Sequence, residues 1–241
     1  MTDTPPTQAK PAPLRRIGQV EVDGRLGWRK QVETLGLSLR LRKGDPQKGF
    51  DREKNTYLAL QGKGLPVPDL LDVGDSFFVT AHAGPNLFHL RKGNPEHPEV
   101  FNNALVEAAT ALAHLHAGGF CHGRPALKDI CWQDGRVTFI DLDRAGPGSA
   151  DGQGYARDIL IFFFSAITET GGTGPEIAAA ARAYRNADTG GHWNRAVARA
   201  QRLNRYRWAL APLSKLLKNK REFRAILPFL GFMTREPAVL P

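Results

Sequence analysis

Residues 116–144 read HAGGFCHGRPALKDICWQDGRVTFIDLDR, and this stretch decides which fold the sequence predicts. A Gly-Gly pair ends a helix, a loop begins at His122, and two short apolar strands follow, joined by an Asp-Gly pair that is typical of a hairpin turn. Asp129 lies just before the first strand and Asp141 at the end of the second. Because the two strands flank the loop, we expect these two carboxylates to converge on one point.

The pair Asp129 and Asp141 is the candidate centre of chemistry in this sequence. A carboxylate just past an apolar strand costs free energy to hold near a core unless it binds something. Two convergent carboxylates offer hard oxygen ligands, which suit Mg²⁺ because this ion usually keeps several waters and bridges to substrate phosphates. The residues also allow a plainer interpretation, in which Asp141 only caps its strand and accepts hydrogen bonds from nearby backbone.

Towards the C-terminus the sequence predicts mostly helices. Their apolar residues recur at helical spacing, and they are expected at 101–116, 155–168 and 175–186, with two or more basic helices after residue 191. The exception is the hairpin, whose strands are expected at 130–132 and 137–142.

Towards the N-terminus the pattern changes to short strands. They are expected at 17–22, 26–32, 70–73 and 76–80, with one helix at 50–61. Residues 35–41 (LGLSLRL) alternate between apolar and polar and fit either a strand or a helical arm. We therefore predict an α+β protein with a disordered, proline-rich tail at 1–13, a β-rich part at 14–82 and a helical part at 83–241.

The central stretch resembles a known family. The loop from His122 to Ile130 aligns without a gap on the kinase catalytic-loop pattern H-R-D-L-x-x-x-N, and Asp141-Leu142-Asp143 stands where kinases have D-F-G. Over residues 17–165 the chain is similar to the protein-kinase-like superfamily and, within it, to the bacterial lipopolysaccharide (Kdo) kinase family. The resemblance implies a two-lobed protein-kinase-like fold that binds ATP and Mg²⁺ and transfers a phosphoryl group to a sugar, lipid or protein hydroxyl.

The resemblance also implies roles for single residues. Asp129 and Asp141 would hold the metal ion, Lys30 would hold the nucleotide phosphates, and Glu53, at the start of the following helix, would orient Lys30. Arg40 is the rival for the lysine position, because its segment also reads as a strand.

Further roles are implied around the loop. His122 would be structural, residues 81–85 would form the hinge, and Asp158 would brace the loop from below, although the dipole of its helix explains Asp158 equally well. The lysine that many kinases carry in the loop is Ala126 here, so the nearby Lys128 is the candidate for a phosphate contact.

Two departures from the kinase pattern bear on activity. Arg124 replaces the Asp that accepts the proton of the substrate hydroxyl, and no G-x-G-x-x-G loop precedes Lys30. General-base assistance is worth about 10²–10⁴ in rate, whereas phosphoryl transfer rests mostly on positioning and charge neutralisation. Asp129 or Asp143 could supply the carboxylate, or Arg124 could neutralise phosphate charge, so Arg124, Asp129 and Asp141 are the candidate catalytic residues. The alternative is a pseudokinase that serves as a nucleotide-binding or regulatory scaffold.

The positive charge is concentrated in one region. The chain holds 33 Lys and Arg against 24 Asp and Glu, and residues 172–241 hold 13 against four, which accounts for the whole net charge of +9. Arg195, Arg199 and Arg202 share one helix face. Such a basic amphipathic helix fits a phosphorylated glycolipid, another anionic acceptor or an anionic membrane surface, and a merely solvated face is an equal alternative. Nucleic acid is a weaker option, because no nucleic-acid-binding module accompanies the charge.

Composition sets the remaining bounds. Two cysteines cannot build a disulfide framework, which makes a reducing cytosol the default, and no apolar run reaches the roughly 18 residues of a membrane span. We therefore expect a cytoplasmic protein, with peripheral contact with the inner membrane as a further expectation. A nuclease or metal hydrolase built on the same carboxylates is a weaker hypothesis, because the order of elements is kinase-like.

Overall fold

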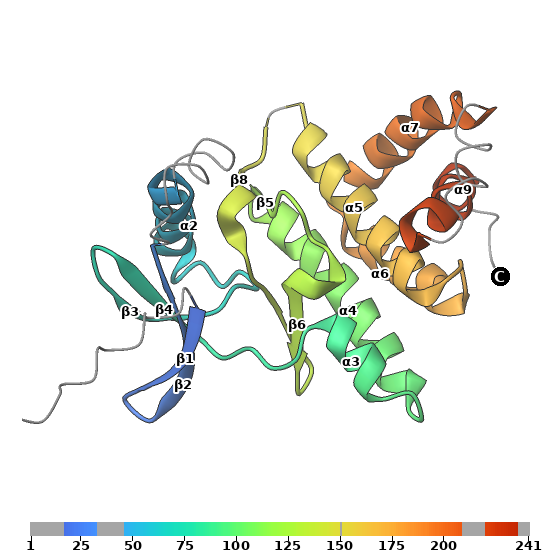
Figure 1. The fold of residues 1–241 in the computed structure, drawn as a ribbon. Coiled ribbons are helices and arrows are strands. Elements are labelled where there is room, and N and C mark those ends of the chain that lie inside the picture. The colour runs from blue at the N-terminus through green and yellow to red at the C-terminus, as the bar shows by residue number, and fades with distance from the viewer. Residues whose placement is uncertain (1–16, 33–45, 150, 209–219, 236–241) are drawn as a thin grey trace, which may run out of the picture.

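The computed structural model describes residues 17–32, 46–149, 151–208 and 220–235. Within these residues a small antiparallel sheet and one helix come first, and a mostly helical part follows. Figure 1 shows the sheet on one side, the long helices on the other, and the short central strands between them. The predicted α+β class is confirmed.

Four strands form the sheet, in the order β1-β2-β4-β3, and each is antiparallel to its neighbours. They span Ile17–Val22 (β1), Arg25–Gln31 (β2), Leu70–Val73 (β3) and Phe77–Ala81 (β4). Asp23 and Gly24 join β1 to β2 with φ angles of 49° and 75°, which is the left-handed pair that a two-residue hairpin turn needs. All four strands were predicted from their sequence patterns. The ends of β1 and β3 agree with the prediction, and β2 and β4 are each shifted by one residue.

Helix α2, Pro46–Leu60, packs beside the sheet. The ring centroids of Phe50 and Tyr57 each lie 5.4 Å from that of Phe78 on β4. The helix begins at Pro46 rather than at residue 50, because proline is well tolerated in a first helical turn. The prediction that Glu53 opens this helix is therefore wrong, since Glu53 lies in its middle.

Six helices form most of the rest of the described molecule. They are α3 (Leu87–Gly93), α4 (Pro98–Ala117), α5 (Gln153–Thr170), α6 (Pro175–Ala187), α7 (His192–Asn204) and α9 (Arg221–Thr234). Helix α4 runs through the core, where Leu105, Ala108 and Leu112 are completely buried. This apolar face was predicted from its spacing, and the structure confirms it.

Helix α3 was not predicted. Asn86 caps it, since the Asn86 side chain accepts a hydrogen bond of 2.9 Å from the backbone N–H of His89. Only Leu87 and Leu90 are buried in this short helix. One apolar pair is too little for a periodic pattern, although the cap residue was a local signal.

Short strands and turns connect the two parts. Strand β5 (Phe120–Cys121) pairs with β8 (Gly146–Pro147), and β6 (Ile130–Gln133) pairs with β7 (Arg136–Phe139). Two 3₁₀ turns, η1 (Leu127–Asp129) and η2 (Leu142–Arg144), flank the β6–β7 hairpin. The predicted return strand at 137–142 is wrong at its end, because Asp141 adopts a left-handed φ of 61° and the chain turns into η2.

Some expectations fall outside the described residues. These are the tail at 1–13 and the arm at 35–41, which includes Arg40, the rival of Lys30. Among the helices that are described, none combines the length and the apolar character needed to cross a membrane.

Candidate functional site

A cleft of about 510 Å³ lies where the sheet, α2 and the β6–β7 hairpin meet. Its volume is within the range of small-molecule and cofactor sites. One wall is apolar and aromatic and comes from the sheet and α2, with Trp28, Tyr57 and Phe78. The opposite wall carries the acidic residues Asp129 and Asp141. The cleft therefore offers a surface for a planar apolar group beside a charged end.

Lys30 and Glu53 form an ion pair inside this cleft. Lys30 lies on β2 and Glu53 on α2, where Glu53 is only 3% exposed. Burial raises the pKa of the Glu53 carboxyl, and the positive charge of Lys30 opposes that rise. A cation held by a buried partner has a fixed position, so the predicted pairing of these two residues is present.

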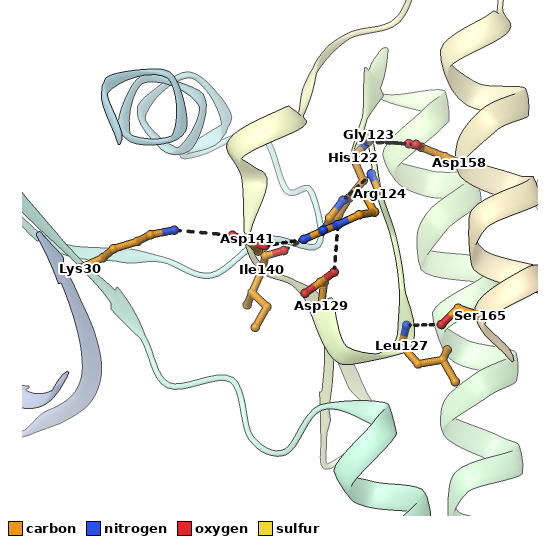
Figure 2. Close-up of polar contacts among 10 residues, drawn as sticks. All are labelled: Lys30, His122, Gly123, Arg124, Leu127, Asp129, Ile140, Asp141, Asp158 and Ser165. Atoms are coloured by element: carbon orange, nitrogen blue, oxygen red, sulfur yellow. Dashed lines mark hydrogen bonds and ion pairs between the residues drawn. The ribbon is translucent and has the colours of Figure 1, made fainter. Parts of the chain in front are cut away.

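Asp141 extends the ion pair across the cleft. Its Oδ1 lies 3.5 Å from Nζ of Lys30, so a residue of the sheet meets one that follows the hairpin (Figure 2). The left-handed backbone at Asp141 is unusual for a residue that is not glycine and is not in a hairpin turn. Aspartate tolerates this conformation better than most residues do, which allows a carboxylate at this position.

The loop that precedes η1 is held from below by Asp158 on α5. The Asp158 carboxylate accepts hydrogen bonds from the backbone N–H of His122, at 2.6 Å, and from that of Gly123, at 3.0 Å (Figure 2). Asp158 is completely buried. The interpretation of Asp158 as a brace for the loop is confirmed by these contacts, whereas an interaction with the helix dipole alone would not need them.

His122 has a structural place in the same loop. Its Nε2 donates to the carbonyl oxygen of Ile140 at 3.0 Å, and its Nδ1 accepts from the backbone N–H of Arg124 at 3.3 Å. Burial lowers the pKa of His122. A neutral imidazole with its proton on Nε2 satisfies both contacts, so His122 ties the loop to the hairpin as a neutral group.

Arg124 lies between the two candidate metal ligands. Its Nη2 donates to Oδ2 of Asp141 at 3.0 Å, and its Nε lies 3.7 Å from Oδ2 of Asp129 (Figure 2). The predicted convergence of Asp129 and Asp141 is thus observed, with a guanidinium at the meeting point. Sequence reasoning placed Arg124 in the loop but could not predict where its long side chain would point.

Asp129 is buried beside this guanidinium. The residue is 5% exposed, and its Oδ2 makes no hydrogen bond to any described residue. Burial raises the pKa of the Asp129 carboxyl to about 6, against the lowering effect of Lys128 and Arg124. The carboxylate is therefore held in the charged form at a cost.

Because of this cost, we expect protonation of Asp129 at lower pH to increase the free energy of unfolding. The pKa of this carboxyl is about 6 in the folded protein against an ordinary value of 3.8, so the folded state keeps a proton between about pH 4 and pH 6 that the unfolded chain has lost. Stability contributed by this group should rise as the pH falls through that window, by at most about 3 kcal/mol. Urea unfolding of the wild type and of Asp129→Asn at several pH values measures it. A difference between the two proteins that stays constant with pH would contradict the prediction.

The residues present do not fit a divalent cation as they stand. Two carboxylates plus phosphates and waters are sufficient for Mg²⁺ in principle. However, both carboxylates already face the Arg124 guanidinium, and the described residues contain no cluster of three or more His, Cys, Asp or Glu that could hold a metal ion. A metal ion would have to displace Arg124 first.

Other predicted residues lie outside the cleft. Lys128 is exposed on η1, and its charge acts on Asp129, but it is not a lining residue. The basic helix α7 lies across the helical part from the sheet (Figure 1). There Arg199 donates to the Gln153 side chain at 3.2 Å, while Tyr206 and Trp208, just after the helix, are exposed.

Sequence reasoning missed the apolar wall of the cleft. Trp28 and Lys30 are two apart on β2, as Phe78 and Thr80 are on β4, so each pair shares a strand face. This alternation was the signal that could have found them.

Comparison with known proteins shows the relationships of the chain. No protein-family model matches it. A protein of Haemophilus influenzae, which carries the name "Uncharacterized protein", is 31% identical over 204 residues, covering 84% of this chain and 84% of the relative. The chain therefore belongs to the same family as this Haemophilus influenzae protein, whose name assigns no activity.

Proposed function

We propose that this family member binds ATP in the cleft and transfers its terminal phosphoryl group to a hydroxyl, as the resemblance to lipopolysaccharide (Kdo) kinases implies. The observation that carries the proposal is the chain of contacts from Glu53 to Lys30 to Asp141. A lysine fixed by a buried glutamate and aimed at an acidic loop is the arrangement by which kinases hold nucleotide phosphates. The two-lobed kinase-like fold is part of the same proposal.

The remaining roles follow the same template. Lys30 would bind the phosphates, Glu53 would orient it, and the aromatic wall would cover the base. Asp129 and Asp141 are the residues that would hold Mg²⁺ if Arg124 moved aside, and the metal would then neutralise phosphate charge. The exposed Lys128 would reach phosphates only at the rim of the cleft.

The acceptor and the location are proposed from charge. A phosphorylated glycolipid or another anionic acceptor suits the basic region around α7, and so does an anionic membrane surface. We place the protein in the cytoplasm, with peripheral contact with the inner membrane.

A second candidate function is favoured by Arg124. A guanidinium stands where kinases have a base, and it is paired with Asp141 and near Asp129. A pseudokinase scaffold would bind nucleotide in the same cleft and transfer nothing.

Replacing Lys30 with methionine tests the nucleotide site. ATP at about 100 times its dissociation constant stabilises a folded protein by about 2.7 kcal/mol, so the wild type should melt several degrees higher with ATP. In Lys30→Met we expect this rise to disappear, because the fixed cation is lost. Lys92→Met removes an exposed lysine from α3 and should keep the full rise. A rise in melting temperature with ATP that persists in Lys30→Met would contradict the assignment of the nucleotide site to this cleft.

An assay of ATP hydrolysis and transfer by the wild-type protein distinguishes the two candidate functions. ADP formation from ATP, measured with and without a glycolipid extract, is expected for the phosphotransferase. A thermal shift without any ADP formation would favour the scaffold.

A further inference from the structure

Five charged side chains form a row of alternating sign, of which four line the cleft and the fifth, Arg124, lies against two of these four. Glu53 contacts Lys30, Lys30 contacts Asp141, Asp141 contacts Arg124, and Arg124 lies near Asp129. Each interior member of this row has an opposite charge on both sides. Asp129 and Asp141 therefore each have a cationic side chain beside them.

Both oxygens of Asp141 are already in use. Oδ1 lies 3.5 Å from the Lys30 ammonium and Oδ2 lies 3.0 Å from a guanidinium nitrogen of Arg124. A metal ion at Asp141 would have to break at least one of these contacts. The freed Arg124 side chain could not lose its positive charge, because a guanidinium keeps its proton in proteins.

The Arg124 backbone is anchored, which fixes the point from which its side chain reaches the two carboxylates. Its N–H donates to His122 Nδ1, and the neighbouring Gly123 N–H donates to the buried Asp158. The loop that carries Arg124 is thus fixed from two sides, and the guanidinium is presented to the carboxylates without the cost of ordering a mobile loop.

We propose that the Arg124 guanidinium takes the place of the divalent cation, so that this cleft binds a nucleoside triphosphate without a metal ion. This inference rests on the proposed nucleotide site. The Arg124 side chain is 35% exposed, and a guanidinium has five N–H donors, of which the carboxylates use only part. The remaining donors suit phosphate oxygens in a bidentate geometry, and with Lys30 they supply two fixed positive charges.

The test compares ATP binding with and without a divalent cation. Melting of the wild type is measured with ATP plus EDTA and with ATP plus Mg²⁺, and the same is done for Arg124→Gln and for Arg136→Gln. Arg136 is exposed on β7, so its variant is a control for the loss of one positive charge. We expect equal rises in EDTA and Mg²⁺ for the wild type and the control. Arg124→Gln should lose at least tenfold in affinity in EDTA.

A second measurement does not involve nucleotide. Titration with Mn²⁺ alone, followed by its electron paramagnetic resonance signal, reports a metal site directly. We expect no specific binding by the wild type and a new site in Arg124→Gln, because no guanidinium then lies between Asp129 and Asp141 and only Lys30 remains beside Asp141.

The outcomes are separable. If the wild type melts higher only when Mg²⁺ accompanies ATP, the inference is overturned and the nucleotide site stands. If Arg124→Gln binds ATP in EDTA as tightly as the wild type does, the inference also fails. If ATP changes nothing under any condition, the proposed function fails together with it.

Discussion

Asp158→Ala is expected to lower the free energy of unfolding by about 3–5 kcal/mol. Asp158 is completely buried, and its carboxylate accepts from the N–H groups of both His122 and Gly123. Alanine leaves two buried donors without a partner, and each such donor costs about 1–3 kcal/mol. Urea unfolding monitored by circular dichroism measures the loss.

Two variants control this result. Asp158→Asn keeps one acceptor oxygen and should lose less than the alanine variant. Asp151→Ala removes an exposed carboxylate just before the same helix, and we expect a much smaller loss than for Asp158→Ala. A loss of under about 1 kcal/mol for Asp158→Ala would show that the loop does not depend on this carboxylate.

Gly123→Ala is the second large effect, with an expected loss of about 2–5 kcal/mol. Gly123 has a φ of 89°, where alanine is strained, and an added Cβ would press on the Arg144 carbonyl and lie 2.7 Å from the Arg144 Cβ. The loop would have to move away from η2, and the Arg124 contacts with it.

The chain offers a matched control for this substitution. Gly119 has a φ of 84° and open space around the position of a Cβ. Gly119→Ala therefore measures the backbone strain alone, about 1 kcal/mol. Equal losses for the two alanine variants would refute the close approach of the loop to η2.

Much of the fold could be predicted, because strong local signals determined it. The Asp-Gly pairs at residues 23 and 134 take left-handed conformations in both hairpins, and α4 buries the apolar face that its spacing predicts. The short α3 was missed, since a helix of two turns has too few residues for periodicity to be visible. The start of α2 was missed because it lies at Pro46, a residue that is tolerated in a first helical turn.

The candidate site was predictable only where backbone order dictates side-chain position. Lys30 meets Glu53 because a strand and the next described helix carry them, and Asp158 meets the loop because α5 packs against β5 and η1 at the two ends of that loop. The direction of the Arg124 side chain was not predictable, because a long, flexible side chain is placed by the carboxylates around it. Lys128 remains a prediction, and Arg40 lies outside the described residues.

The left-handed backbone at Asp141 limits which residues can replace this aspartate without strain. Asparagine and glycine adopt such a conformation at little cost, whereas alanine, glutamate and branched residues strain it. A lineage that loses the acidic group here would therefore pass most readily through asparagine or glycine. The left-handed turn can thus be kept in relatives that have lost the carboxylate and its function.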